Sequence, residues 1–353
     1  MPIRLAALAA MLAAIAPILR GQERGAVYRV PVTGTVEMGL APFVSRSLDE
    51  AAAAGAAAVI LDIDTPGGRI DAAWEIIDAV RDASLPVHAY VNRRALSAGA
   101  MIALSADRLY MRPGSTIGAA TPVVGEGQRA SEKMVSAMRS EFRALAEERG
   151  FDPAIAEAMV DENVAVEGIS EAGRLLTLTT SEAVDLGVAT GVADDWPALV
   201  ASVGLGGAPV REMSPNWAER IVRLLTNPLL APLLLSLGFM GLVIEIRTPT
   251  FGLAGAVGLL CLTAFFGARF VVHLAGMEEA ILLAAGTGLI ALEVFVIPGF
   301  GVAGLAGGVT VMTALMLSML GSYPTVSEVI SALGIIAVSI LVVGALAYAV
   351  LRH

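Results

Sequence analysis

Residues 92–107, NRRALSAGAMIALSAD, pass from an extended segment into a helix, and Ser97 stands where the change occurs. The preceding residues 86–91, PVHAYV, are an apolar run typical of a buried strand. A helix N-terminus has unpaired backbone N–H groups, and its dipole favours negative charge. Because this setting suits both a nucleophile and an oxyanion, Ser97 is a candidate catalytic serine. The competing interpretation is an ordinary helix cap, a role that serine often fills.

A similar turn occurs earlier in the chain. Residues 57–64, AAVILDID, are typical of a buried parallel strand. They lead through TPGG at residues 65–68 into a helix predicted over residues 70–82. The two glycines let the backbone approach a ligand closely. Because parallel strands end at the same edge of a sheet, this turn and the Ser97 turn are expected to lie at one edge.

Lysine occurs only once in this chain. The sequence contains 23 basic side chains, and every one except Lys133 is arginine. An arginine stays protonated, whereas a lysine removed from water can lose its proton and act as a general base. Lys133 lies on the first turn of a helix predicted over residues 132–149, with Ser131 as its cap. Lys133 is therefore the candidate base, and the alternative is a surface lysine without a catalytic role.

The histidines suggest no Ser-His-Asp arrangement. His88 lies inside the strand before Ser97, His273 ends an apolar segment, and His353 is the last residue. The single cysteine, Cys261, lies in an apolar run and excludes an intrachain disulfide. We expect neither a metal nor a cofactor.

The composition predicts a membrane protein with an exported domain. Of the 353 residues 56% are hydrophobic and 16% are charged, which is too apolar for a wholly soluble chain. Residues 1–20 predict a signal peptide, cleaved or kept as an N-terminal anchor, and residues 21–227 predict one globular domain. Residues 228–353 predict about five spans, near residues 229–246, 253–271, 280–297, 302–320 and 329–351. A formal net charge of -10 argues against a nucleic-acid partner.

The predicted membrane part contains a repeat. Residues 241–255 and 289–304 each read as a span, a Pro-x-Phe-Gly turn and a returning span, so two helical hairpins are expected. If the globular domain is exported, both turns face the cytoplasm. Glu245 and Glu293 occupy equivalent places near the inner ends of their spans, and we expect them to cap the turns.

The remaining segments of the globular domain are less regular. The pattern predicts an Ala/Gly-rich flap over residues 119–130 and an amphipathic, membrane-surface helix over residues 216–225. Further elements are expected as strands over residues 25–36, 108–111 and 175–178 and as helices over residues 40–55, 153–162 and from 181 on.

Taken together, these motifs resemble the long-form NfeD family of membrane-bound serine proteases, whose exported domain has the α/β Clp-protease/crotonase fold. The resemblance rests on TPGG at residues 65–68, SAGA at 97–100, STIGAA at 115–120, the helix with Lys133, and LLTLT with EAVDLG at 175–187. Long-form members usually continue into a small OB-type β-barrel domain, whereas this sequence ends at residues 351–353, at the last predicted span.

The resemblance implies a Ser-Lys dyad. Ser97 would be the nucleophile and Lys133 the general base, with the backbone N–H groups of Gly68 and Ala98 as oxyanion donors and Gly67 shaping the turn. It implies a membrane-bound endopeptidase that cuts apolar stretches of stomatin-type (SPFH) membrane proteins, surrounded by membrane lipid and paired as a homodimer or higher homo-oligomer. Two alternatives are a non-catalytic scaffold for such partners and a crotonase-like acyl-CoA enzyme, the latter disfavoured because the N-terminus predicts export.

Overall fold

The computed structural model describes residues 25–124, 128–227, 230–247, 252–272, 277–295, 301–320 and 326–352. The chain divides into two compact units, Met1–Val123 with Arg129–Pro215 and Val124–Gln128 with Asn216–His353. The division falls before helix α9 (Trp217–Leu225), which the sequence placed in the globular domain and the structure groups with the helical unit. The predicted signal peptide or anchor at residues 1–20 lies outside the described residues.

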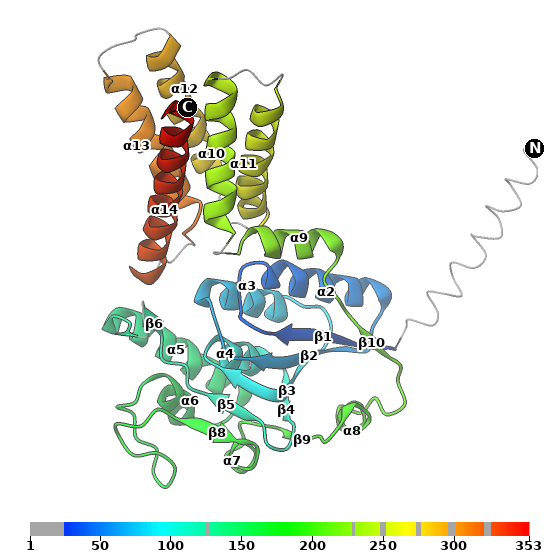
Figure 1. Ribbon diagram of the computed structural model, residues 1–353. Helices are drawn as coiled ribbons and strands as arrows, with labels where there is room; N and C mark the ends of the chain where they lie inside the picture. The colour runs from blue at the N-terminus through cyan, green and yellow to red at the C-terminus, as the bar shows by residue number, and fades with distance from the viewer. Residues whose placement is uncertain are drawn as a thin grey trace, which may run out of the picture. The chain divides into compact units, whose positions relative to one another are not determined.

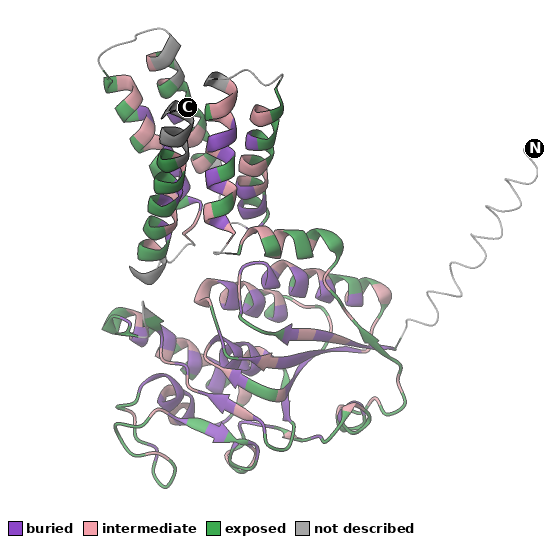
Figure 2. Cartoon of the chain, in the orientation of Figure 1, coloured by how far each residue is buried: buried purple, intermediate pink, exposed green. Residues whose placement is uncertain are grey.

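The first unit is built on a parallel sheet of strand order β10-β1-β2-β3-β4-β9 (Figure 1). These strands are β1 (Val27–Thr33), β2 (Ala58–Thr65), β3 (Val87–Leu96), β4 (Arg108–Met111), β9 (Gly191–Val192) and β10 (Val210–Glu212). β2 and the first half of β3 are buried because helices cover both faces of the sheet, which explains their continuous apolar sequences (Figure 2). The α/β class predicted for this domain is confirmed.

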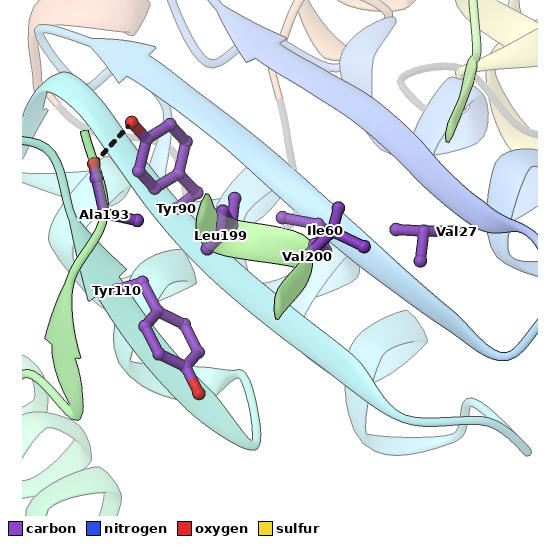
Figure 3. Packing of buried hydrophobic residues seen from close by; sticks show 7 residues of the cluster. All are labelled: Val27, Ile60, Tyr90, Tyr110, Ala193, Leu199 and Val200. Carbon is purple, nitrogen blue, oxygen red and sulfur yellow. Dashed lines mark hydrogen bonds between the residues drawn. The ribbon is translucent and has the colours of Figure 1, made fainter. Parts of the chain in front are cut away.

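One face of the sheet carries helices that follow directly from its strands. They are α2 (Leu40–Ala54), α3 (Ile70–Arg81) and α4 (Ala98–Ser105), and each packs on its neighbour in this series. On the other face, α8 (Trp196–Ser202) packs Leu199 and Val200 against Tyr90 and Tyr110 of the sheet (Figure 3). The Tyr90 hydroxyl donates a 2.9 Å hydrogen bond to the Ala193 carbonyl, so its buried polar group is satisfied.

β3 runs past the end of β4, and this extension leads to the Ser97 turn. It pairs with β5 (Thr116–Gly118), which in turn pairs antiparallel with β8 (Thr177–Thr179). The remaining elements of this unit are α5 (Glu132–Arg149), α6 (Pro153–Val160) and α7 (Thr180–Asp185). Part of the predicted flap forms a short hairpin, β6 (Val123–Val124) with β7 (Gln128–Arg129), and residues 125–127 lie outside the described part.

The second unit is helical. After α9 it contains α10 (Ala231–Arg247), α11 (Leu253–Val271), α12 (Met277–Phe295), α13 (Val302–Leu317) and α14 (Val326–Arg352) (Figure 1). Among the described residues, Leu253–Val271 is the one helix both long and apolar enough to cross a bilayer, and the apolar helices Ala231–Glu245, Val302–Leu317 and Val329–Ala345 are shorter. The predicted helical class is confirmed, while the number of spans stays a prediction.

The two predicted hairpins are present as α10–α11 and α12–α13, and each is closed by a glutamate. The Glu245 carboxylate accepts hydrogen bonds from the backbone N–H groups of Gly252 (2.9 Å) and Gly255 (3.2 Å). The Glu293 carboxylate accepts from the N–H groups of Gly301 (2.7 Å), Ala303 (3.1 Å) and Gly304 (3.3 Å). Each carboxylate therefore caps the N-terminus of the returning helix, as the sequence predicted.

Glycines let the paired helices approach closely. A Cβ added to Gly241 would lie 2.5 Å from the Ala254 carbonyl oxygen, and one added to Gly286 would lie 2.8 Å from that of Gly307. Small residues at such crossings are the usual means by which membrane helices bring their backbones together.

Candidate active site

Ser97 lies at the N-cap position of α4 with a backbone conformation that L-residues rarely adopt. Its φ is 54° and its ψ is -121°. The conformation is fixed from outside, because the Ser97 N–H donates a 3.0 Å hydrogen bond to the carbonyl of Gly118 at the end of β5. The Ser97 side chain makes no capping hydrogen bond. Ser97 is therefore not an ordinary helix cap, and strain maintained by surrounding structure is a feature of functional sites.

The TPGG turn lies directly against Ser97. A Cβ added to Gly67, whose φ is 100°, would lie 2.6 Å from the Ser97 Cβ and 3.2 Å from its Oγ. Gly68 packs against the backbone of Val36, because a Cβ added to Gly68 would lie 2.1 Å from the Val36 carbonyl oxygen. The structure thus brings Ser97, Gly67 and Gly68 together at one edge of the sheet, as the sequence predicted for parallel strands.

Thr65 orders this turn, a role that the sequence did not single out. The Thr65 side chain is fully buried, accepts a 3.0 Å hydrogen bond from the Gly67 N–H and donates a 2.5 Å hydrogen bond to the Gly34 carbonyl. The signal available in the sequence is a hydroxyl residue just before a Pro-Gly-Gly turn, a pattern typical of side-chain to backbone bonds.

The backbone N–H groups of Gly68 and Ala98 donate no hydrogen bond to any described residue. Gly68 follows the glycine that touches Ser97, and Ala98 follows Ser97 itself as the first residue of α4. N–H groups left without protein acceptors at a helix N-terminus favour an anion. These two groups are thus available to an oxyanion.

Lys133 lies on the first turn of α5, and α5 packs against α4, the helix that begins after Ser97. The Lys133 side chain is exposed, and within the described residues it forms no hydrogen bond or ion pair, including with Ser97. The desolvated ammonium expected of a general base is therefore not found. The buried face of α5 begins only at Val135, which explains the exposure of Lys133. Ser131, predicted to cap α5, occupies the N-cap position without a side-chain bond.

His88 cannot replace Lys133. It lies near the start of β3 and pairs with Arg108 of β4, whereas Ser97 follows the strand's far end. Nine residues of extended chain separate the two by roughly 30 Å at the usual rise of a strand. Cys261 is a free thiol, and the described residues contain no cluster of His, Cys, Asp and Glu that could hold a metal.

The chain thus combines a parallel α/β unit that carries a strained serine at the edge of its sheet with an apolar helical unit, one helix of which is long enough to cross a bilayer. The chain belongs to the NfeD family. The model of the NfeD1b N-terminal domain matches residues 26–213, and that of the NfeD integral membrane domain matches residues 229–352. The predicted family and fold class are confirmed.

The relatives include a membrane protease. Membrane protein NfeD1b of Bacillus subtilis is 42% identical over 84% of this chain and 68% of its own length. Membrane-bound protease PH1510 of Pyrococcus horikoshii is 28% identical over 92% of this chain and 76% of its own. A solved structure of the 1510-N membrane-bound stomatin-specific protease, a lysine-to-alanine mutant in complex with a substrate peptide, is 26% identical with a TM-score of 0.51. That similarity covers 57% of this chain and 97% of that one.

Proposed function

We propose that this protein is a membrane-bound serine endopeptidase that uses Ser97 as nucleophile and Lys133 as general base. The observation that carries the proposal is the strained Ser97. It fails to cap its helix and lies against Gly67, beside two N–H groups that donate to no described residue. The homology to a membrane-bound protease supports a peptidase of this fold. Among the described residues no other side chain with a basic nitrogen that can lose its proton lies on the helices adjoining Ser97.

The chemistry proceeds through an acyl-enzyme. The Ser97 Oγ attacks the scissile carbonyl, and its proton passes to the Lys133 amine. The N–H groups of Gly68 and Ala98 hold the tetrahedral oxyanion. Lys133 then returns the proton to the leaving amine as the peptide C–N bond breaks, and a water molecule hydrolyses the serine ester by the same route.

The exposure of Lys133 makes the bound substrate part of this mechanism. An apolar peptide segment laid over the site excludes water from the ammonium, which the isolated chain leaves solvated, and the free amine is then favoured. An apolar stretch of a stomatin-type protein would be a substrate of this kind, and the similar protease of known structure is named as stomatin-specific. We propose that the site lies on the extracytoplasmic side of the membrane. The chain would span the membrane several times and assemble as a homodimer or higher homo-oligomer.

The test is an active-site serine probe applied to the purified full-length protein in detergent. A fluorophosphonate should label the wild type and fail to label Ser97→Ala. Lys133→Arg keeps the positive charge but cannot accept the serine proton, so its peptide turnover should fall to the level of Lys133→Ala. Labelling that persists in Ser97→Ala, or a Lys133→Arg variant with most of the wild-type turnover and normal circular dichroism, contradicts the dyad.

A second candidate function is a catalytically silent scaffold that gathers stomatin-type partners. It is favoured by one observation, the absence of a hydrogen bond between Lys133 and Ser97 within the described residues. The probe separates the two functions, because a scaffold does not react and keeps partner binding in Ser97→Ala.

A further inference from the structure

Asp161 is a buried carboxylate with no part in the dyad chemistry. Its side chain is 4% exposed and lies just after α6. One of its oxygens accepts hydrogen bonds from Arg129 (2.9 Å) and from the backbone (3.1 Å) and side-chain (3.0 Å) nitrogens of Asn163, and the other accepts from Arg139. Burial raises the pKa of Asp161, but the bonds from Asn163 and Arg129 outweigh it and hold this pKa below the usual value of 3.8.

The two arginines that bind Asp161 stand on either side of Lys133 in the sequence. Arg129 ends the flap hairpin at β7, four residues before Lys133, and Arg139 lies on α5, six residues after it. Both arginines also approach Glu132, the residue next to Lys133, at 3.9 Å from Arg129 and 3.5 Å from Arg139. A closed ring of charges therefore brackets the first turn of α5.

Besides the ring, this turn is held by a 2.9 Å hydrogen bond from the Ala130 N–H to the Pro122 carbonyl and by the buried Val135. Side chains at the turn itself add little. Ser131 does not cap α5 through its side chain, and Lys133 forms no polar bond to a described residue. The far end of α5 is fixed separately, because Arg149 donates to the carbonyls of Ala106 (2.9 Å) and Val188 (3.1 Å). A change at Asp161 should thus free the start of α5 and leave its end in place.

We propose that Asp161 is a positioning residue for Lys133, fixing the backbone of the base through Arg129 and Arg139 while the lysine side chain swings between solvent and Ser97. The proposal rests on the proposed function. A charge paired with two guanidinium groups in a buried place is strongly directional. Without the Asp161 charge, Arg129 keeps only its pairs with Glu132 and Glu162, and Arg139 keeps its pair with Glu132. These partners are exposed, and exposed pairs hold a side chain weakly.

The experiment uses Asp161→Asn in the full-length protein, with Asp62→Asn as matched control. Asp62 is similarly buried and is also paired with an arginine, Arg29 at 2.5 Å, but it lies on β2 away from α5. Hydrogen exchange of peptides covering residues 129–137 should speed up at least tenfold in Asp161→Asn and stay unchanged in Asp62→Asn. For peptide cleavage, kcat should fall at least tenfold below that of the wild type in Asp161→Asn, with KM changed by less than threefold. Asp62→Asn should not show this fall in kcat.

Arg139→Gln removes one of the two arginines that bind Asp161. It should also speed up hydrogen exchange at residues 129–137 and lower kcat, but by less than Asp161→Asn does. This variant replaces Asp161→Asn in the experiment if Asp161→Asn does not fold. Equal loss of kcat in Asp161→Asn and Asp62→Asn, or faster exchange with unchanged kcat, overturns the positioning role. A wild type that neither cleaves peptide nor labels with the probe refutes the proposed function instead. In that case unchanged exchange at residues 129–137 in Asp161→Asn still counts against the ring as the anchor of α5.

Discussion

Ser97 and the glycines beside it show how close packing at single residues builds the site. Gly67 has no room for a side chain because Ser97 fills the space, and Gly68 has none because the Val36 backbone fills it. The turn and the serine therefore hold each other in place, and the Gly68 N–H keeps its position next to the Ser97 turn. Preorganised N–H groups of this kind stabilise an oxyanion without having to move during the reaction.

Gly68→Ala should abolish most of the activity without unfolding the protein. The added Cβ would meet the Val36 carbonyl oxygen at 2.1 Å, so the turn must shift and carry the Gly68 N–H away from the oxyanion. Displacing one such donor lowers kcat by about 10²–10³-fold in other enzymes. Peptide turnover measures the effect. Gly206→Ala is the control, because the nearest heavy atom to a Cβ added there is 3.7 Å away. A similar loss of turnover in Gly206→Ala would refute the steric explanation.

His88 should make the stability of the α/β unit depend on pH. Burial lowers the pKa of His88 from 6.5, Asp107 opposes the shift and Arg108 adds to it. Between the lowered pKa and 6.5 the unfolded chain binds more protons than the folded one, so stability falls as the pH drops below 6.5, by at most about 1.4 kcal/mol per pH unit. Thermal unfolding followed by tryptophan fluorescence should show a smaller loss of Tm between pH 7 and pH 5 in His88→Gln. If Tm fell equally with pH in the wild type and in His88→Gln, His88 would not be the source of the pH dependence.

At the scale of the elements, the two hairpins of the helical unit share the same glutamate cap. In each hairpin a glutamate near the end of the first helix satisfies the N–H groups that begin the second. In both repeats those N–H groups come at or just after a Pro-x-Phe-Gly sequence. The carboxylate thus joins the two helices of a hairpin where their backbones separate, and it meets the positive end of a helix dipole.

Glu293→Gln should lower the Tm of the helical unit in detergent. The amide keeps the shape of the side chain but loses the charge that strengthens three hydrogen bonds, at a cost of roughly 1–3 kcal/mol. Glu245→Gln should behave alike because its geometry is equivalent. Circular dichroism during heating measures the effect, with Glu278→Gln on the exposed first turn of α12 as control. A control that falls as far as Glu293→Gln would show that general loss of negative charge is responsible.

At the scale of the whole molecule, we expect the α/β unit and the hairpin turns on opposite sides of the membrane. Cysteines placed singly at Glu171 and at Thr250, in a Cys261→Ser background, report on each side. Glu171 is exposed in the α/β unit, and position 250 lies between α10 and α11 in the sequence. A membrane-impermeant maleimide should label Glu171→Cys in intact cells and label Thr250→Cys only after lysis. If Thr250→Cys alone were labelled in intact cells, the chain would have the opposite orientation in the membrane and the prediction would be wrong.

Features that depend on neighbouring residues followed from the sequence alone. The change from an apolar strand to an Ala/Gly helix located Ser97, the Pro-Gly-Gly turn located Gly67 and Gly68, and the repeat located the Glu caps. The spacing of apolar residues and the residue types that form turns are set by neighbours a few residues apart, so both can be recognised in the sequence.

The tertiary structure alone decided how these parts act together. The positive φ of Ser97 depends on the Gly118 carbonyl, supplied by β5 after a whole helix and strand intervene. The ring at Asp161 joins the flap, α5 and the end of α6, and the exposure of Lys133 depends on where the buried face of α5 begins. These partners lie about twenty to thirty residues apart in the chain. Which of them meet is fixed by the order of strands and the packing of helices on the sheet, and no local pattern encodes that order.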